Sequence, residues 1–209
     1  ENIVKVLLIN GSARQRGNTY TALNQVAEQL KKNGVDGEIV WIGHKPIRGC
    51  IACNTCKTKG NCRCAFEEDI CNDVIAKMMD CDGLVVGSPV YWGQPNGAVL
   101  SLIQRMAYSA GGYMSGKPAA AVCVCRRGGA TAAFQALQMP FQMLNMPIVT
   151  SQYWNIAYGR TEGESAQDDE GMQTMRTLAN NMSYMLKKFA TGTAEVESKE
   201  PWLPTNFIR

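Results

Sequence analysis

The chain has 209 residues, a length typical of one α/β domain, and nine of these residues are cysteines. Its net charge of +3 is too small for a dedicated nucleic-acid surface, so we expect no nucleic-acid partner. No apolar run reaches the roughly 18 residues of a membrane span, and the run 6–9 is too short for a signal peptide. Clustered cysteines without an export signal favour a reducing compartment, so we expect a cytoplasmic protein.

Apolar runs and helical patterns alternate along the chain. The expected strands are apolar almost throughout and cover 3–9, 37–43, 83–93 (running into a loop), 118–125 and 148–154. The expected helices carry apolar residues at helical spacing and cover 19–34, 67–80, 97–108, 128–145 and 168–189. The acids Glu67, Glu68 and Asp69 fit the start of a helix, where negative charge is favourable.

Buried strands separated by helices predict a doubly wound parallel sheet of five strands with helices on both faces. We expect one domain over 1–189, a cysteine-rich insertion at 48–66 after the second strand, and an extended tail over 190–209. Ligands of such sheets bind beyond the carboxyl ends of the strands, where the strand order switches. The loops after the first, third and fourth strands are therefore the candidate sites.

The loop after the first strand, GSARQRGNT, is rich in groups that bind phosphate. Ser12, Asn18 and Thr19 offer hydroxyl and amide groups, Arg14 offers positive charge, and a helix N-terminus follows. The pattern is neither GxGxxG nor the Walker motif. The alternative is an ordinary strand-to-helix turn with Asn18 or Thr19 as the N-cap residue.

The other two loops add a stiff aromatic segment and a cationic glycine turn. GSPVYWGQPNG places Tyr91 and Trp92 at a strand end, where aromatic side chains line a planar ring or, alternatively, cover the sheet edge or an interface. RRGGA supplies two arginines, Arg126 and Arg127, and two glycines before a helix, and its alternative is a plain glycine turn with solvated arginines. Together the three loops suit a mononucleotide with a flat ring, and FMN fits best.

These three loops resemble the flavin-binding loops of the NADPH-dependent FMN reductase superfamily, whose fold is flavodoxin-like. The resemblance covers about 4–186 and implies the following FMN-binding residues: Ser12, Arg14, Asn18, Thr19 and neighbouring Tyr20 at the phosphate; Pro89, Val90, Tyr91, Trp92 and Gly93 along the ribityl chain and ring; Arg127, Gly128 and Gly129 at the ring's polar edge. FMN carries the chemistry in that family, so no catalytic side chain is expected. His44, the only histidine, fits a surface loop.

The cysteine-rich insertion resembles that of the iron–sulfur flavoprotein branch. The resemblance implies that Cys50, Cys53, Cys56 and Cys62 hold a [4Fe–4S] cluster. Zinc and a metal-free loop remain alternatives, and Cys64 is either a spare thiol or a replacement for Cys62. The other four cysteines lie in helix or strand patterns, and we expect them to be small buried residues: Cys71, Cys81, Cys123 and Cys125.

The expected function is an FMN-dependent oxidoreductase that passes electrons from NAD(P)H to a small acceptor such as a quinone, an azo compound or a flavin. One alternative is an iron–sulfur flavoprotein electron carrier fed by ferredoxin. Another is a non-catalytic, flavodoxin-like redox or metal sensor. The resemblance also implies a homodimer or homotetramer.

Overall fold

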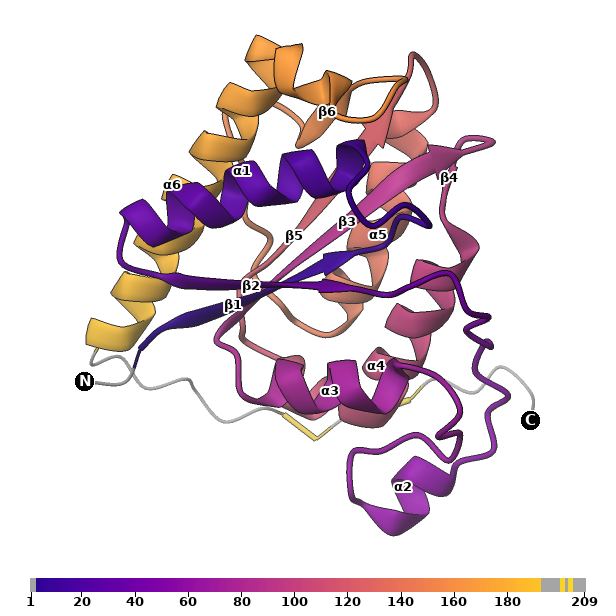
Figure 1. Cartoon of the computed structure of the whole chain (residues 1–209). Helices are drawn as coiled ribbons and strands as arrows, with labels where there is room; N and C mark the ends of the chain where they lie inside the picture. Colours follow the sequence, from indigo (N-terminus) through magenta and orange to yellow (C-terminus); the bar gives the residue numbers. More distant parts are fainter. Residues whose placement is uncertain (1–2, 193–199, 202, 205–209) are drawn as a thin grey trace.

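The computed structural model describes residues 3–192, 200–201 and 203–204. Its centre is a parallel sheet of five strands in the order β2-β1-β3-β5-β6 (Figure 1). These strands are β1 (Lys5–Asn10), β2 (Asp36–Trp41), β3 (Gly83–Tyr91), β5 (Ala119–Cys125) and β6 (Ile156–Tyr158). The two-residue strand β4 (Gln94–Pro95) pairs antiparallel with the end of β3 and forms a hairpin with it. The expected doubly wound parallel sheet is confirmed.

Helices cover both faces of the sheet. α1 (Asn18–Lys32) and α6 (Asp169–Thr191) pack on one face, while α3 (Cys71–Met79), α4 (Gly97–Met114) and α5 (Ala130–Met143) pack on the other. Val6 and Leu8 belong to the first core, and Leu7 and Ile9 belong to the second. Successive strand residues point to opposite faces, so a strand covered on both sides is apolar throughout.

The last strand of the sheet lies later in the chain than expected. β6 begins at Ile156, and within the predicted 148–154 only Ile148 forms a bridge, with Ala119. Two short helices, α2 (Thr55–Lys59) and the 3-10 helix η1 (Glu164–Gln167), were not expected. α6 continues to Thr191, and the expected extended tail over 190–209 lies largely outside the described residues.

The acids before α3 do not form its first turn, because this helix begins at Cys71 rather than at residue 67. Each acid pairs with an arginine instead: Glu67 with Arg63, Glu68 with Arg48, and Asp69 with Arg105. Asp69 also accepts a hydrogen bond of 3.1 Å from the backbone N–H of Cys71.

The strand order switches between β1 and β3, and their carboxyl ends are joined directly. The backbone N–H of Gly11 donates a hydrogen bond of 2.8 Å to the carbonyl of Gly87. A Cβ atom at Gly11 would lie 2.7 Å from that oxygen, so only glycine fits there. The Asn96 side-chain amide donates to the Gly11 carbonyl over 2.7 Å and joins the loop after β3 to the loop after β1. The two loops therefore form one edge.

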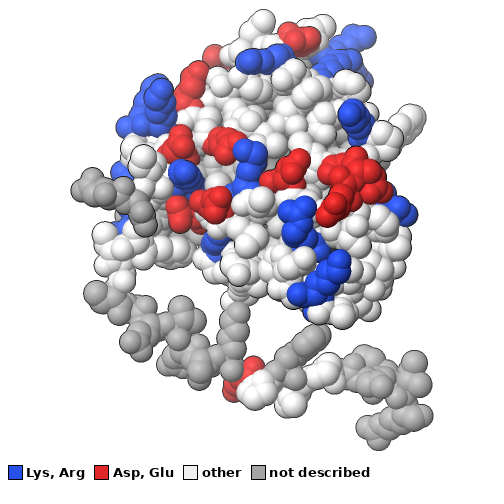
Figure 2. Space-filling model, turned by 60° about the horizontal axis from the view of Figure 1, so that its bottom comes forward, with Lys and Arg blue, Asp and Glu red and all other residues white. Residues whose placement is uncertain are grey.

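The surface carries both signs of charge. On the lower face of the molecule, turned forward in Figure 2, basic and acidic side chains are interspersed. In the part of the chain that the structure describes, no helix has the length and hydropathy that would let it span a bilayer.

Candidate functional site

A cavity of about 190 Å³ opens at the carboxyl edge of the sheet, at the switch between β1 and β3. Seven residues of the expected FMN site line it: Ser12, Arg14, Asn18, Thr19, Pro89, Val90 and Tyr91. Six others do not contribute to its lining: Tyr20, Trp92, Gly93, Arg127, Gly128 and Gly129. The lining also includes residues outside the expected FMN-binding set: Gly17, Val124, Cys125, Arg126, Gly159 and Arg160.

The first loop is fixed by its own hydrogen bonds. The Ser12 hydroxyl accepts a hydrogen bond of 3.1 Å from the backbone N–H of Arg14, and the Ser12 carbonyl accepts one of 2.7 Å from the Trp41 indole. Gly17 is the N-cap residue of α1 and supplies no side-chain cap, so neither Asn18 nor Thr19 has that role. The first turn of α1 contains no acid. An uncapped helix N-terminus facing a cavity favours an anion there.

The loop after β6 forms the opposite wall, and Asn18 holds it. The Asn18 amide donates to the Thr161 carbonyl over 2.8 Å and accepts from the Ser165 N–H over 3.1 Å. A Cβ atom at Gly159 would lie 2.8 Å from the Asn18 amide nitrogen, so glycine is needed for this close approach. The Asn18 side chain therefore positions a neighbouring loop, a role that the sequence did not predict.

Glu164 closes the same loop. Its carboxylate accepts hydrogen bonds from the backbone N–H groups of Arg160, at 2.6 Å, and Thr161, at 2.7 Å. These bonds, with one from the Thr161 hydroxyl, lower the pKa of Glu164 below its ordinary value. The carboxylate thus turns toward the backbone of its own loop, while Arg160 lines the cavity.

Three arginines from three separate loops line the cavity: Arg14, Arg126 and Arg160. Guanidinium groups bind phosphate through two parallel hydrogen bonds and offset its charge. The sequence had favoured Arg127 over its neighbour Arg126. It gave no signal for Arg160, because the loop that carries this residue follows a strand that the sequence placed too early.

The hairpin between β3 and β4 stands at the rim of the cavity. Tyr91 is half-exposed, and Trp92 is fully exposed with a left-handed φ of 52°. Gly93 lies against Gly129, where a Cβ atom would come within 2.9 Å of the Gly93 Cα. The third and fourth loops therefore meet, as expected, although these two glycines meet outside the cavity lining.

The cysteine-rich segment lies at the other end of the molecule from α1, around α2 and beside α3 and α4 (Figure 1). Four of its cysteines line one void of about 20 Å³: Cys50, Cys53, Cys56 and Cys64. Cys62 is not among the residues that line it. Phe66, Arg105 and Tyr108 form other parts of the wall.

The backbone of this segment is tightly wound. Ala52, Asn54 and Cys62 have left-handed φ angles of 53°, 60° and 55°. Such conformations are unfavourable for residues other than glycine and are concentrated in ligand clamps. Within the described residues, no three His, Cys, Asp or Glu side chains gather closely enough to hold a single metal ion. A [4Fe–4S] cluster needs thiolates that are farther apart, because each binds a different iron.

The remaining cysteines are buried, as expected. Burial raises the pKa of Cys71 and of Cys123 to about 12. Burial also raises the pKa of Cys81 and Cys125. By contrast, hydrogen bonds from the Thr55 hydroxyl and backbone lower the pKa of Cys53, which is exposed. The four thiols outside the insertion are therefore inert, and the thiols of the insertion are the available ligands.

A buried arginine links the cysteine-rich segment to α4. The side chain of Arg105 is only 1% exposed and forms an ion pair with Asp69. Burial lowers the pKa of Arg105, but hydrogen bonds to Asp69 and Cys64 outweigh burial and hold that pKa above its ordinary value. Its Nε donates to the Cys64 sulfur over 3.2 Å. The sequence pattern of α4 did not single out this residue.

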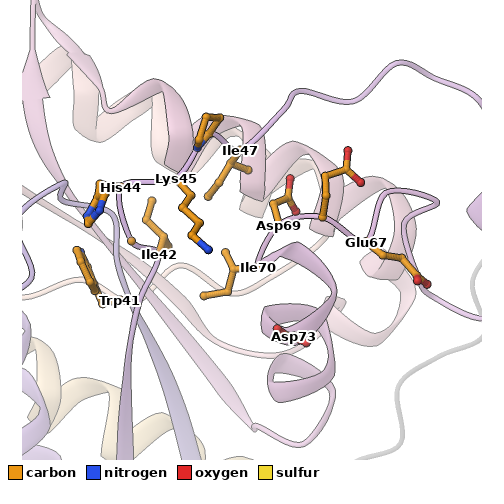
Figure 3. A pocket seen from close by; sticks show the side chains of 12 residues that line it. Trp41, Ile42, His44, Lys45, Ile47, Glu67, Asp69, Ile70 and Asp73 are labelled. Atoms are coloured by element: carbon orange, nitrogen blue, oxygen red, sulfur yellow. The ribbon is translucent and has the colours of Figure 1, made fainter.

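A further cavity of about 430 Å³ lies between the loop after β2 and the start of α3 (Figure 3). His44 is exposed there, as expected for a surface loop, and its ring lies 5.7 Å from that of Trp41. The Lys45 side chain extends between Ile42 and Ile70, and Asp69 contributes to the wall. This cavity lies between the first loop and the cysteine-rich segment.

The sequence and the fold both match known flavoproteins. The model of the NADPH-dependent FMN reductase family matches residues 4–161. An iron-sulfur flavoprotein of Methanocaldococcus jannaschii is 29% identical over 192 residues, which cover 88% of this chain and 98% of the relative. An iron-sulfur flavoprotein of Archaeoglobus fulgidus is 32% identical over 193 residues, which cover 86% and 94%.

Solved structures share the fold at low sequence identity. RosB with bound 8-demethyl-8-formylriboflavin-5'-phosphate superposes with a TM-score of 0.69 at 16% identity, over 99% of this chain and 94% of that one. A flavodoxin from the domain Archaea gives a TM-score of 0.58 at 11% identity, over 88% and 99%. The chain belongs to the NADPH-dependent FMN reductase family, in its iron–sulfur flavoprotein branch.

Proposed function

We propose that the chain takes electrons from NAD(P)H through FMN and passes them to a small acceptor such as a quinone, an azo compound or free flavin. The observation that carries the proposal is the cavity at the carboxyl edge, with Arg14, Arg126 and Arg160 around an uncapped helix N-terminus. This combination suits a phosphomonoester, whose charge of about −2 needs both cations and N–H donors.

The residues have distinct proposed roles. Arg14, Arg126 and Arg160 bind the FMN phosphate with the Ser12 and Thr19 hydroxyls, and Asn18 holds the wall behind them. The segment 89–93 lines the ribityl chain and the ring, and the turn 127–129 lies at the ring's polar edge. FMN supplies the chemistry when bound, since its ring accepts a hydride and releases electrons singly or in pairs. The protein binds and orients the ring, and no catalytic side chain is assigned.

A second candidate function is supported by the four cysteines that line one void. In this reading the segment holds a [4Fe–4S] cluster, through which ferredoxin delivers electrons one at a time. The donor set fits the group: it consists of thiols, of which Cys50 and Cys53 are exposed, beside a buried guanidinium that offsets negative charge. The void is small, so the segment has to widen around a cluster.

The self-association expected from the resemblance has a candidate surface. Five aromatic side chains in the β3–β4 hairpin and around β6 are about half-exposed or more: Tyr91, Trp92, Tyr153, Trp154 and Tyr158. Exposed aromatic groups are typical of interfaces between protein chains. We propose a cytoplasmic homodimer or homotetramer, which sedimentation of the holoprotein tests directly.

Two assays on anaerobically purified protein test the functions. NAD(P)H oxidation with a quinone supports the first, and reduction of the bound flavin by reduced ferredoxin supports the second. The visible spectrum is read beforehand, because bound FMN and an iron–sulfur cluster absorb differently. A colourless protein that fails to take up added FMN would contradict both functions.

A further inference from the structure

Arg105 clamps the two ends of the cysteine-rich insertion onto α4. Its guanidinium donates to the carbonyl of Arg48 over 3.3 Å and to that of Phe66 over 3.2 Å, and these residues bound the segment 48–66. The Arg48 guanidinium also lies 3.8 Å above the Phe66 ring and closes the base of the loop. The Nε of Arg105 donates to the sulfur of Cys64.

Cys64 is held in place through its backbone as well. Its N–H donates over 2.8 Å to the side-chain oxygen of Asn72, whose amide donates back to the Cys64 carbonyl over 3.1 Å. Asn72 is buried on α3. Helices α3 and α4 together therefore hold Cys64 in place at the void that Cys50, Cys53 and Cys56 also line.

Cys62 differs from Cys64 in its backbone conformation and in its place relative to the void. Its backbone is left-handed, with φ at 55°, and its side chain is not part of the lining of the void. Both cysteines are half-buried and pack against the same core, so burial does not distinguish them. The spacing of Cys62 from Cys56 matches the cluster motif, but the chain turns at Cys62, and the next cysteine, Cys64, lines the void with the other three.

We propose that Cys64, and not Cys62, is the fourth thiolate ligand of the iron–sulfur cluster, and that Arg105 is the positioning residue that holds it. This inference rests on the proposed cluster. Arg105 is suited to the role because its planar guanidinium satisfies four acceptors at once, and Asp69 balances its charge. An N–H···S hydrogen bond to a ligand sulfur stabilises the more negative, reduced state and raises the reduction potential.

The first experiment compares Cys64→Ala with Cys62→Ala after anaerobic reconstitution with iron and sulfide. Alanine replaces both because serine oxygen can itself bind iron. We expect C62A to keep the wild-type iron and sulfide content and the electron paramagnetic resonance signal of the reduced cluster. We expect C64A to lose both while keeping its FMN, which shows that the domain is still folded.

If C64A retains the cluster and C62A loses it, the ligand assignment alone is overturned. Wild-type protein that keeps FMN but takes up no iron overturns the proposed cluster and the assignment together. These outcomes are therefore distinguishable within one set of samples.

The second experiment measures the cluster's reduction potential in Arg105→Met combined with Asp69→Asn, so that neither charge is buried alone. We expect a more negative potential, because the hydrogen bond to the Cys64 sulfur is lost. The matched control is Arg63→Met with Glu67→Gln, an exposed ion pair of the same segment, which should leave the potential unchanged. An unchanged potential in the Arg105 variant, with full cluster content, would refute the positioning role.

Discussion

The side-chain amide of Asn18 donates a hydrogen bond to the Thr161 carbonyl and accepts one from the Ser165 N–H. These partners follow Asn18 by 143 and 147 positions in the sequence, yet they form one wall of the cavity with it. The first turn of α1 is thereby joined to the loop after β6. Arg14, in the loop before α1, and Arg160, in the loop after β6, then line the same cavity. The phosphate site proposed here depends on this junction.

Replacing Asn18 by alanine should both destabilise the fold and weaken FMN binding. Two hydrogen bonds are lost and the Ser165 N–H loses its acceptor, so we expect a loss of about 1–3 kcal/mol in unfolding free energy. Urea unfolding and FMN titration measure the two effects. The control is Asn24→Ala on the same helix, whose amide makes an exposed hydrogen bond of 2.8 Å to Glu28. Equal losses in both variants would argue against the junction.

Replacing the arginines that line the cavity should weaken FMN binding, and replacing Arg126 should weaken it more than replacing Arg127. A hydrogen bond to a charged group contributes about 1.5–3 kcal/mol, so Arg14→Ala and Arg126→Ala should each raise the Kd about 10–100-fold. Arg127→Ala should have a smaller effect, because this residue is not part of the cavity lining. Fluorescence titration with FMN measures all three, and Arg63→Ala in the cysteine-rich segment serves as the control. The idea fails if Arg126→Ala binds FMN like the wild type.

The core of the fold follows from the sequence because buried parallel strands leave a strong signal. The central residues of β1, 6–9, are all apolar since both faces of this strand are covered. β6 gave a weaker signal, because it has only three residues, whereas the longer predicted strand before it, 148–154, makes only a bridge. Because the last strand was predicted to end too early, Gly159 and Arg160 were not expected at the carboxyl edge of the sheet. An error of a few residues in one edge strand therefore removed one wall of the site from the prediction.

Side-chain direction set a second limit on what the sequence revealed. Arg126 and Arg127 are adjacent, and their order alone does not say which one faces the cavity. Arg105 left a usable signal, since it lies three residues after Leu102 and one before Met106, both fully buried. A charge on the apolar face of a helix needs a buried partner. Asp69 is that partner, but the two residues are 36 positions apart, and only the fold brings them together.

Glu164 should stabilise its loop only where its carboxylate is ionised. Its folded-state pKa is lowered, so the unfolded chain binds the proton more readily and stability rises with pH through this window. The contribution is present above the ordinary glutamate pKa of about 4.3 and is lost as pH falls through the lower folded value. Urea unfolding of wild type and Glu164→Gln at neutral and acidic pH measures it. We expect the difference between the two to shrink on acidification, and Glu162→Gln is the control in the same loop.

Cys123 should resist alkylation for as long as the sheet is intact. It is fully buried in β5, and burial raises its pKa to about 12, so both access and thiolate are lacking at neutral pH. Cys50 and Cys53 are exposed and should react with iodoacetamide at once after iron has been removed. Mass spectrometry of timed samples separates the peptides. Modification of Cys123 should then follow the rate of global unfolding and speed up in urea, whereas rapid labelling in native buffer would mean that β5 opens locally.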